Sequence, residues 1–360
     1  MDIALVLRSF STRGGTERYA ANLARWLLAR GHDVHLYANE IAIDATPDGL
    51  QVHKIQTARP RTLSFLRATT GVRNNGHDLV QGFGRTLGHD VYRAGGGVHA
   101  AWLEASGNTA YTKLRGAVSP NEWLARYIDR RAIQEARIVI CNSEFAAAQV
   151  SAHHGVEARR VRVIRNGVDG ERFRPRPERR RELRARWGAT GRVLAFVGNG
   201  FRRKGLRVAG RAFARVSSPA DRLVVVGRDA HAEQALRPLR RLLGGQLIAV
   251  GEVGDPESYI AAADATVLPT LYDSAANTTL ESLATGVPPI TSSRDGNAEI
   301  VPDARLIVAD PLDVEGVADA IRFAWGESKW VNRCRSVAEE WTVARNGTAV
   351  EDVYREILND

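Results

Sequence analysis

Cysteine, long apolar runs and a basic leader are scarce or missing in this sequence, and each absence excludes a class of protein. The two cysteines among 360 residues, Cys141 and Cys334, lie far apart without metal-ligand spacing. This argues against a disulfide-stapled secreted domain and favours a reducing compartment. No run of eighteen apolar residues occurs, so we expect no membrane-spanning helix. Residues 1–10 have no basic start, which predicts a buried first strand rather than a signal peptide and hence a cytoplasmic protein.

Several ligand-binding motifs are absent as well. The pair Gly14–Gly15 follows a predicted strand, but it lacks the three-glycine spacing of dinucleotide-binding turns and the Gly-Lys-Ser/Thr ending of a phosphate loop. A nicotinamide or ATP site is therefore not favoured. Because no Asp-x-Asp pair and no cluster of His and Cys at ligand spacing is present, we expect no bound metal and no cofactor. Cationic side chains and helix ends would then have to neutralise any diphosphate group.

The basic residues are unevenly distributed along the chain. The net charge is +9, with 22 basic against 14 acidic residues in 1–165, 8 against 4 in 166–190, and 20 against 23 in 191–360. A basic front half suggests an anionic partner such as an acidic lipid, a phosphorylated glycan or nucleic acid. A solvated, arginine-rich surface has the same composition, so both interpretations stay open.

Residues 170–190 contain eight arginines and two prolines, which predicts a linker with a short helix near 177–187. Glu178 and Glu182 interrupt the arginines, and no aromatic platform follows them. These features favour a solvated linker over a nucleic-acid-binding arm. We therefore expect no nucleic-acid partner.

Short apolar runs alternate with amphipathic segments in both halves of the chain, which predicts two α/β domains. The domains are placed at 1–168 and 191–340, with the linker at 169–190 and a last segment at 341–360. The expected strands cover residues 3–7, 34–38, 79–83, 87–92, 138–141 and 161–164 in the first half, and 192–197, 222–226, 247–250, 265–268, 289–292 and 306–308 in the second.

The stretch 268–299 carries the densest pattern of acidic and small residues. Asp273 and Glu281 stand eight positions apart, and between them lie small residues that let a backbone approach a ligand: Ala275, Ala276, Asn277 and Thr278. Asn277 or Thr278 can cap a following helix, whose free N–H groups favour an anion. One carboxylate can bind sugar hydroxyls and the other ribose hydroxyls. The alternative is an ordinary capped helix with a solvent-facing Glu281.

Two further glycine-rich loops carry candidate functional residues. Gly198 and Asn199 follow a predicted strand and precede Arg203 and Lys204, an arrangement that supplies charge-assisted donors for a diphosphate. The Arg–Lys pair can equally be a solvated pair. In the front half, His99 follows a run of three glycines and is a candidate for catalysis, against the alternative of a loop histidine with no chemical role.

Together these segments resemble the family-4 retaining glycosyltransferases of the GT-B fold, over nearly the whole chain. The matching segments are Gly14–Gly15, Asn166–Asp169, Gly198–Gly205, Val226–Gly227, the Asp273 and Glu281 pair, Gly286–Pro288 and Trp341 with the last helix. In the family two Glu flank seven residues, and here Asp273 takes the first place. The segment Asp90–Tyr92 is similar to one in the enzymes of lipopolysaccharide core assembly.

The resemblance implies two Rossmann-like domains that face each other across a cleft, with a C-terminal helix that crosses back to the N-terminal domain. It implies catalytic roles for His99, Asp273, Arg203 and Lys204. It also implies that the donor is bound by Gly14, Gly15, Gly198, Asn199, Arg203, Lys204, Gly227, Ala276, Asn277, Thr278 and Glu281.

The implied activity is the retaining transfer of a sugar, hexosyl in type and independent of metal, from a nucleoside-diphosphate sugar, with UDP as the expected carrier. The acceptor is expected to be a glycan or a glycolipid such as lipopolysaccharide core, reached at an anionic membrane surface on the inner face of the cytoplasmic membrane. Two alternatives remain open. One is a GT-B nucleotide-sugar epimerase, which needs no acceptor, and the other is a non-catalytic sugar-nucleotide-binding protein.

Overall fold

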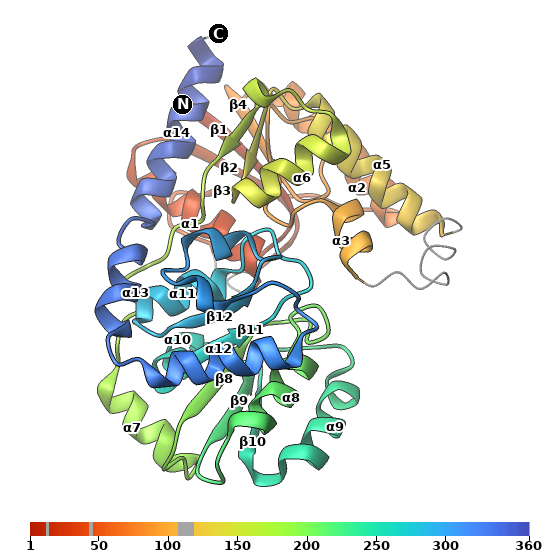
Figure 1. The fold of residues 1–360 in the computed structure, drawn as a ribbon. Helices are drawn as coiled ribbons and strands as arrows, with labels where there is room; N and C mark the ends of the chain where they lie inside the picture. The colour runs from red at the N-terminus through yellow and green to blue at the C-terminus, as the bar shows by residue number, and fades with distance from the viewer. Residues whose placement is uncertain (12–13, 43–45, 107–118, 360) are drawn as a thin grey trace. The chain divides into compact units, whose positions relative to one another are not determined.

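The computed structural model describes residues 1–11, 14–42, 46–106 and 119–359, which fold into two α/β units (Figure 1). The first unit combines Met1–Gly167 with Val343–Asp360, and the second spans Val168–Thr342. Each unit has its own parallel sheet and its own hydrophobic core. None of the helices in the described ranges is long and apolar enough to cross a membrane.

The sheet of the first unit has the spatial order β3-β2-β1-β4-β5-β6-β7, with all neighbouring strands parallel. The strands are β1 Asp2–Phe10, β2 Asp33–Ile41, β3 Gln51–Lys54, β4 Leu79–Phe83, β5 Val91–Arg93, β6 Ile138–Cys141 and β7 Val161–Val163. The helices are α1 Gly15–Ala29, α2 Arg61–Gly71, α3 His99–Ala105, α5 Pro120–Glu135, α6 Glu144–His154 and α14 Val343–Asn359. Strands such as β4 and β6 are buried along their whole length, as expected when helices cover both faces of a sheet.

The strand predicted at 87–92 is wrong in its extent, because β5 begins only at Val91. Gly88 before it has a φ of +76°, which breaks an extended backbone. Asp90 immediately precedes the strand, and its carboxylate accepts a hydrogen bond of 3.0 Å from the backbone N–H of Val80.

The second unit repeats the parallel design, with the order β10-β9-β8-β11-β12-β13. Its strands are β8 Val193–Val197, β9 Arg222–Val226, β10 Leu247–Gly251, β11 Ala265–Leu268, β12 Pro289–Ser292 and β13 Ile307–Val308. Its helices are α7 Pro177–Arg186, α8 Leu206–Val216, α9 Ala232–Leu243, α10 Pro256–Ala262, α11 Asn277–Thr285, α12 Val314–Gly326 and α13 Trp330–Ala338. The loops that follow β8 and β11 therefore leave the same edge of one sheet.

The last helix belongs to the first unit although it follows the second in sequence. Tyr354 of α14 is fully buried, and its hydroxyl donates a hydrogen bond to Gln81 of β4. Helices α14 and α1 approach so closely that a Cβ on Gly347 would lie 2.4 Å from the Trp26 ring. This return of the chain is the C-terminal crossing that the sequence predicts.

Residues 169–190 are not the solvated linker that their composition suggests. They lie within the second unit, where α7 packs on α10 and buries Leu183 and Trp187. Arg180 and Arg184 both bind the carboxylate of Asp264, at 2.5 and 3.0 Å. The reason for the difference is that Leu183 and Trp187 stand four positions apart and form an apolar face, which the excess of arginine conceals.

Candidate active site

The loop between β8 and α8 carries the predicted phosphate-binding residues and is held by hydrogen bonds with the end of β9 and the loop after it. The N–H of Gly198 donates to the carbonyl of Val226 at 2.9 Å, and the side-chain oxygen of Asn199 accepts from the N–H of Arg228 at 2.7 Å. Gly227 has a φ of +131°, and a Cβ there would lie 2.2 Å from the carbonyl oxygen of Gly198. Gly227 is therefore required by this close backbone approach.

The two cations of the loop converge on one carboxylate. Arg203 Nη1 donates to Asp273 Oδ2 at 2.8 Å, and the Lys204 ammonium donates to the same oxygen. The convergence requires glycine at position 205, where φ is +81°. A Cβ on this residue would lie 2.2 Å from the carbonyl oxygen of Pro269. The backbone N–H of Leu271 donates to the carbonyl of Arg203 at 2.8 Å, which joins the two loops further.

Asp273 and Lys204 are both buried, so their charges interact in a medium less polar than water. Burial by itself would raise the pKa of Asp273, but the charges of Lys204 and Arg203 outweigh it and hold that pKa below its usual value. The three groups therefore form a charged cluster with one net positive charge. Such a cluster can exchange its carboxylate partner for a phosphate oxygen.

The N-terminus of α11 lies beside this cluster in sequence and is anchored from another element. Sequence reasoning missed the anchor, Asp295, which follows β12 and is almost completely buried. Its carboxylate accepts from the N–H of Ala276 at 2.8 Å and from the hydroxyl of Thr279 at 2.7 Å. Burial, followed by the charge of Asp273, raises the pKa of Asp295. The available signal was an Asp three residues after a predicted strand and immediately before Gly-Asn.

The capping predicted for Asn277 or Thr278 is wrong. Ala276 occupies the N-cap position without a side-chain cap, and the hydroxyl of Thr278 instead donates to the carbonyl of Val197 at 3.0 Å. Helix α11 therefore begins at Asn277, one residue earlier than it would if Asn277 were the N-cap. The hydrogen bond of Thr278 connects the helix to the end of β8. Glu281, in the second turn, is buried rather than solvent-facing.

The first unit positions the remaining predicted donor-binding residues at the end of β1. Gly14 is the N-cap of α1 with a φ of +90°, and Gly15 is the first residue of that helix. A Cβ on Gly14 would lie 2.3 Å from the carboxylate of Glu17. The roles of Gly14 and Gly15 toward a donor stay predictions.

His99 is the first residue of α3 and is oriented by acidic residues that sequence reasoning missed. Its Nε2 lies 2.6 Å from the carboxylate of Glu122 on α5, and its backbone N–H donates to Asp129 at 3.3 Å. Burial raises the pKa of Asp129. No sequence signal connects these residues, because they stand 23 and 30 positions from the histidine. Catalysis by His99 stays a prediction.

The residue that precedes the loop before His99, Arg93, carries a buried guanidinium group. Arg93, at the end of β5, lies 3.7 Å from the centroid of the Tyr19 ring and donates to the side chain of Asn166 at 2.5 Å. Burial lowers the pKa of Arg93. Within the described residues its Nη1 has no hydrogen-bond partner. Arg93 thus links α1, β5 and the segment after β7 inside the first unit.

Comparison with known proteins identifies the family. The model described as Glycosyltransferase Family 4 matches residues 13–172, and the one described as Glycosyl transferases group 1 matches 191–326. A probable transglycosylase of Burkholderia thailandensis is 30% identical over 334 residues, which cover 88% of this chain and 84% of that protein. The chain belongs to glycosyltransferase family 4. It is a glycosyltransferase, as the sequence predicts.

The same comparisons confirm the fold. The lipopolysaccharide glucosyltransferase WaaG of Escherichia coli is 23% identical over 94% of both chains. A crystal structure of WaaG superposes with a TM-score of 0.84 at 21% identity, covering 98% of this chain and 99% of that one. HepE of Anabaena, solved in complex with UDP-glucose, gives a TM-score of 0.75 at 16% identity over 98% and 99% of the two chains. The predicted GT-B architecture of this glycosyltransferase is therefore confirmed.

Proposed function

We propose that this glycosyltransferase moves a sugar from a nucleoside-diphosphate sugar, with UDP as the carrier, to a glycan or glycolipid acceptor with retention of the anomeric configuration. The observation that carries the proposal is the convergence of Arg203 and Lys204 on one buried oxygen of Asp273. Two cations held together at the carboxyl edge of a parallel sheet are a site for an anion. The N-terminus of α11 adds a partial positive charge in the same loop region.

The donor diphosphate fits this site in charge and in hydrogen-bonding character. Its oxygens would replace the carboxylate of Asp273 as the partners of Arg203 and Lys204, and Asp273 would then be available for sugar hydroxyls. Buried Glu281 is the proposed ligand of the ribose hydroxyls. HepE, which shares the fold, has been solved with UDP and with UDP-glucose. This supports a UDP-linked donor for the present chain as a proposal.

The proposed reaction breaks the bond between the anomeric carbon and the diphosphate oxygen and forms a bond from that carbon to an acceptor hydroxyl oxygen. The electron pair of the broken bond stays on the leaving diphosphate. The acceptor proton goes to a diphosphate oxygen on the same face, so the configuration is retained. The protein then contributes by positioning the two substrates and by stabilising the leaving diphosphate. Arg203 and Lys204 supply this stabilisation.

The acceptor is proposed from charge and from similarity. The first unit, residues 1–167 and 343–360, carries a net charge of +6 and the second unit carries +3, and a basic surface attracts phosphorylated or membrane-anchored glycans. WaaG is named for lipopolysaccharide and is similar to this chain over nearly its full length. We accordingly propose a lipopolysaccharide-core type acceptor, met at an anionic membrane surface on the cytoplasmic side.

Donor binding is tested by calorimetry with UDP, UMP, ADP and GDP. We expect UDP to bind best, and the double variant Arg203→Ala/Lys204→Ala to bind it at least about 100-fold more weakly, since two charge-assisted contacts contribute about 1.5–3 kcal/mol each. Arg207→Ala, an exposed arginine on α8, is the matched control and should be unaffected. The double variant leaves the buried carboxylate of Asp273 without its two cations, which could disturb folding. A triple variant that also carries Asp273→Asn removes this charge, so weak UDP binding by the triple variant is due to the lost cations. Undiminished UDP binding by both variants would place the diphosphate elsewhere.

Turnover is tested with UDP-sugars and delipidated and intact lipopolysaccharide acceptors. Release of UDP together with a product of retained anomeric configuration, assigned by NMR coupling constants, supports the proposal. Conversion of the UDP-sugar without any acceptor would instead identify an epimerase. Tight UDP binding with no turnover of any sugar would identify a non-catalytic binding protein.

A further inference from the structure

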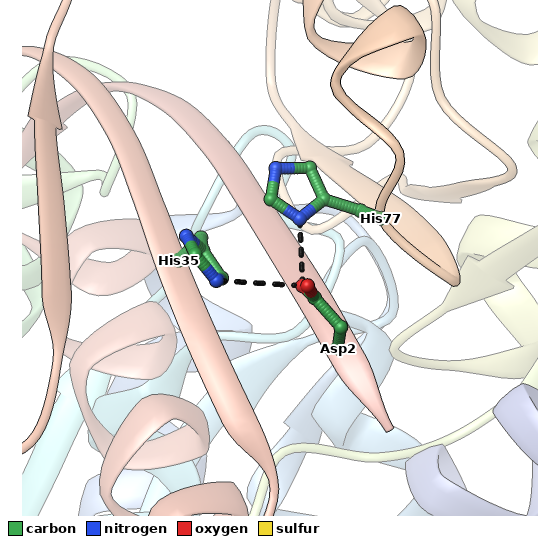
Figure 2. A group of neighbouring side chains, drawn as sticks. All are labelled: Asp2, His35 and His77. Atoms are coloured by element: carbon green, nitrogen blue, oxygen red, sulfur yellow. Dashed lines mark hydrogen bonds and ion pairs between the residues drawn. The ribbon is translucent and has the colours of Figure 1, made fainter.

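A cluster of histidines lies at the edge of the first unit's sheet that is opposite to Gly14 and His99. Asp2 begins β1, His35 stands near the start of β2, and His77 lies two residues before β4. The strands are parallel, so these positions meet at the amino edge of the sheet, whereas the predicted donor-binding residues follow its carboxyl edge. Figure 2 shows the two imidazole rings directed at the Asp2 carboxylate.

The inner atoms of the cluster form a compact set of possible metal ligands. His77 Nδ1 lies 2.6 Å and His35 Nε2 3.5 Å from the same oxygen, Asp2 Oδ1. One ligand atom from each residue lies within 4.8 Å of the other two. Two imidazoles and one carboxylate are the donor types that zinc and its neighbours in the first transition row prefer.

The outer nitrogen of each ring also has a partner. His35 Nδ1 lies 2.9 Å from His53 Nε2, and His77 Nε2 lies 2.9 Å from the hydroxyl of Tyr37. A histidine that ligates a metal through one nitrogen carries its proton on the other, and an acceptor there fixes the ring orientation. Tyr37 and His53 are both able to accept that proton's hydrogen bond. The rings of Tyr37 and His53 also stack, with centroids 4.4 Å apart, which holds the two acceptors in place.

We propose that Asp2, His35 and His77 bind a divalent transition-metal ion of the zinc type, with Tyr37 and His53 as the outer partners of the two histidines. Tetrahedral zinc with bonds of about 2.0–2.1 Å places its ligand atoms about 3.3 Å apart. The His35–Asp2 separation of 3.5 Å already matches this value. The distance between His77 Nδ1 and Asp2 Oδ1 has to increase by about 0.7 Å to reach the same value. A rotation of the Asp2 side chain, which is 40% exposed, provides this increase.

The site would be structural and independent of the transfer reaction. Three protein ligands leave the fourth coordination position of a tetrahedral ion open. Water can reach this position because the side chain of Asp2 is partly exposed. The three ligands come from β1, β2 and the segment before β4, which are neighbours in the sheet. A bound ion would therefore cross-link the starts of three central strands. This differs from a catalytic metal, which would have to lie near the donor diphosphate.

The experiment uses the full chain with any polyhistidine tag removed, after treatment with a chelator. Titration with Co²⁺ is followed by its visible absorption, and Zn²⁺ is then added as a competitor. We expect one Co²⁺ per chain, displaced by Zn²⁺ but not by Mg²⁺. We also expect Zn²⁺ to raise the melting temperature.

Four variants connect the signal to the cluster. Asp2→Asn keeps the size of a half-exposed side chain and should abolish the Co²⁺ spectrum, as should His35→Gln. Tyr37→Phe removes an outer partner and should weaken binding by about 10–100-fold. His153→Gln is the control, because His153 also lies near a carboxylate, Glu104, at 3.8 Å, but belongs to α6.

Absence of stoichiometric Co²⁺ binding in the unaltered chain would overturn the proposal. So would binding that survives Asp2→Asn and His35→Gln together. In either case the cluster would be a hydrogen-bonded network, with His77 donating to Asp2 and the hydroxyl of Tyr37 donating to His77.

Discussion

Asp273 interacts with two cations whose proposed function is to bind something else. Its low pKa means that the ionised carboxylate is stabilised in the folded chain, mainly by Lys204 and Arg203 against the opposing effect of burial. A carboxyl group with a depressed pKa contributes stability above its unfolded pKa of about 3.9. That contribution is lost as the pH falls through the lower, folded value.

We predict that Lys204→Met is destabilised at neutral pH and approaches the parent chain at acid pH. Without Lys204 the folded pKa of Asp273 rises toward the unfolded value, so the variant has less electrostatic stabilisation to lose on acidification. Urea unfolding between pH 3 and 7 measures the difference. Lys329→Met, at an exposed position, should follow the parent curve at every pH. A difference that is constant across the range would show that Asp273 is not the group responsible.

Asp295 acts as an N-terminal anchor of α11 without belonging to that helix. We predict that Asp295→Ala lowers the free energy of unfolding by several kcal/mol, because it leaves the buried N–H groups of Ala276 and Asn297 and the buried hydroxyl of Thr279 without an acceptor, at about 1–3 kcal/mol each. Asp295→Asn keeps an acceptor oxygen and should lose less. Urea denaturation gives both values. Equal losses in the two variants would mean that packing, not hydrogen bonding, is the role of Asp295.

The attachment of α14 depends on a glycine at the crossing with α1. We predict that Gly347→Ala destabilises the chain although alanine favours a helix, because the new methyl group would overlap the Trp26 ring. Gly326→Ala, at the end of α12 with open space around it, is the control and should be neutral or slightly stabilising. Thermal unfolding of both variants checks this. A stable Gly347→Ala chain would show that α14 moves away at little cost.

Helix α7 illustrates how an arginine-rich composition can mislead. Two of its arginines bind within the second unit, where Asp264 accepts from Arg180 and Arg184 and also from the backbone N–H of Val193. Burial opposes ionisation of Asp264, but these hydrogen bonds and charges lower its pKa. The arginines of 179–186 are therefore less available to an anionic surface than their number suggests.

The net charge of +9 leads to a prediction about membranes. We predict that the protein sediments with anionic vesicles at low ionic strength, leaves neutral vesicles unbound and is released by high salt, since each near-surface basic residue contributes about 1 kcal/mol and salt screens the attraction. In α5 of the first unit, Trp123 is 66% exposed and stacks on Tyr127, with Arg131 one turn further on. Aromatic rings of this kind settle at membrane interfaces.

The vesicle assay has a matched pair of variants. Trp123→Ser should weaken sedimentation with anionic vesicles, whereas Leu312→Ser, an equally exposed apolar residue of the second unit, should not. If neither the parent chain nor the variants prefer anionic vesicles, the positive charge is a general surface property and the acceptor is a soluble glycan.

Local patterns in the sequence were enough to predict much of this glycosyltransferase. Alternating apolar runs predicted two α/β domains, and the expected strands at 192–197 and 289–292 agree with β8 and β12 to within one residue. The glycine loop with Arg203 and Lys204 and the pair Asp273 and Glu281 were also visible, because each is a short motif next to a strand or helix end. The helix cap was predicted wrongly, because Asp295, a residue outside the helix, replaces the local capping group.

Contacts between distant segments were decided only by the tertiary structure. The orientation of His99 by Glu122 and the meeting of Asp2, His35 and His77 leave no trace in the local sequence. Each depends on which strands or helices are neighbours in the folded unit, since that arrangement places residues 23 or more positions apart within hydrogen-bond reach. Periodicity determines that a strand forms and which side chains it buries, whereas sheet order, set by the packing of the whole unit, determines what those side chains meet.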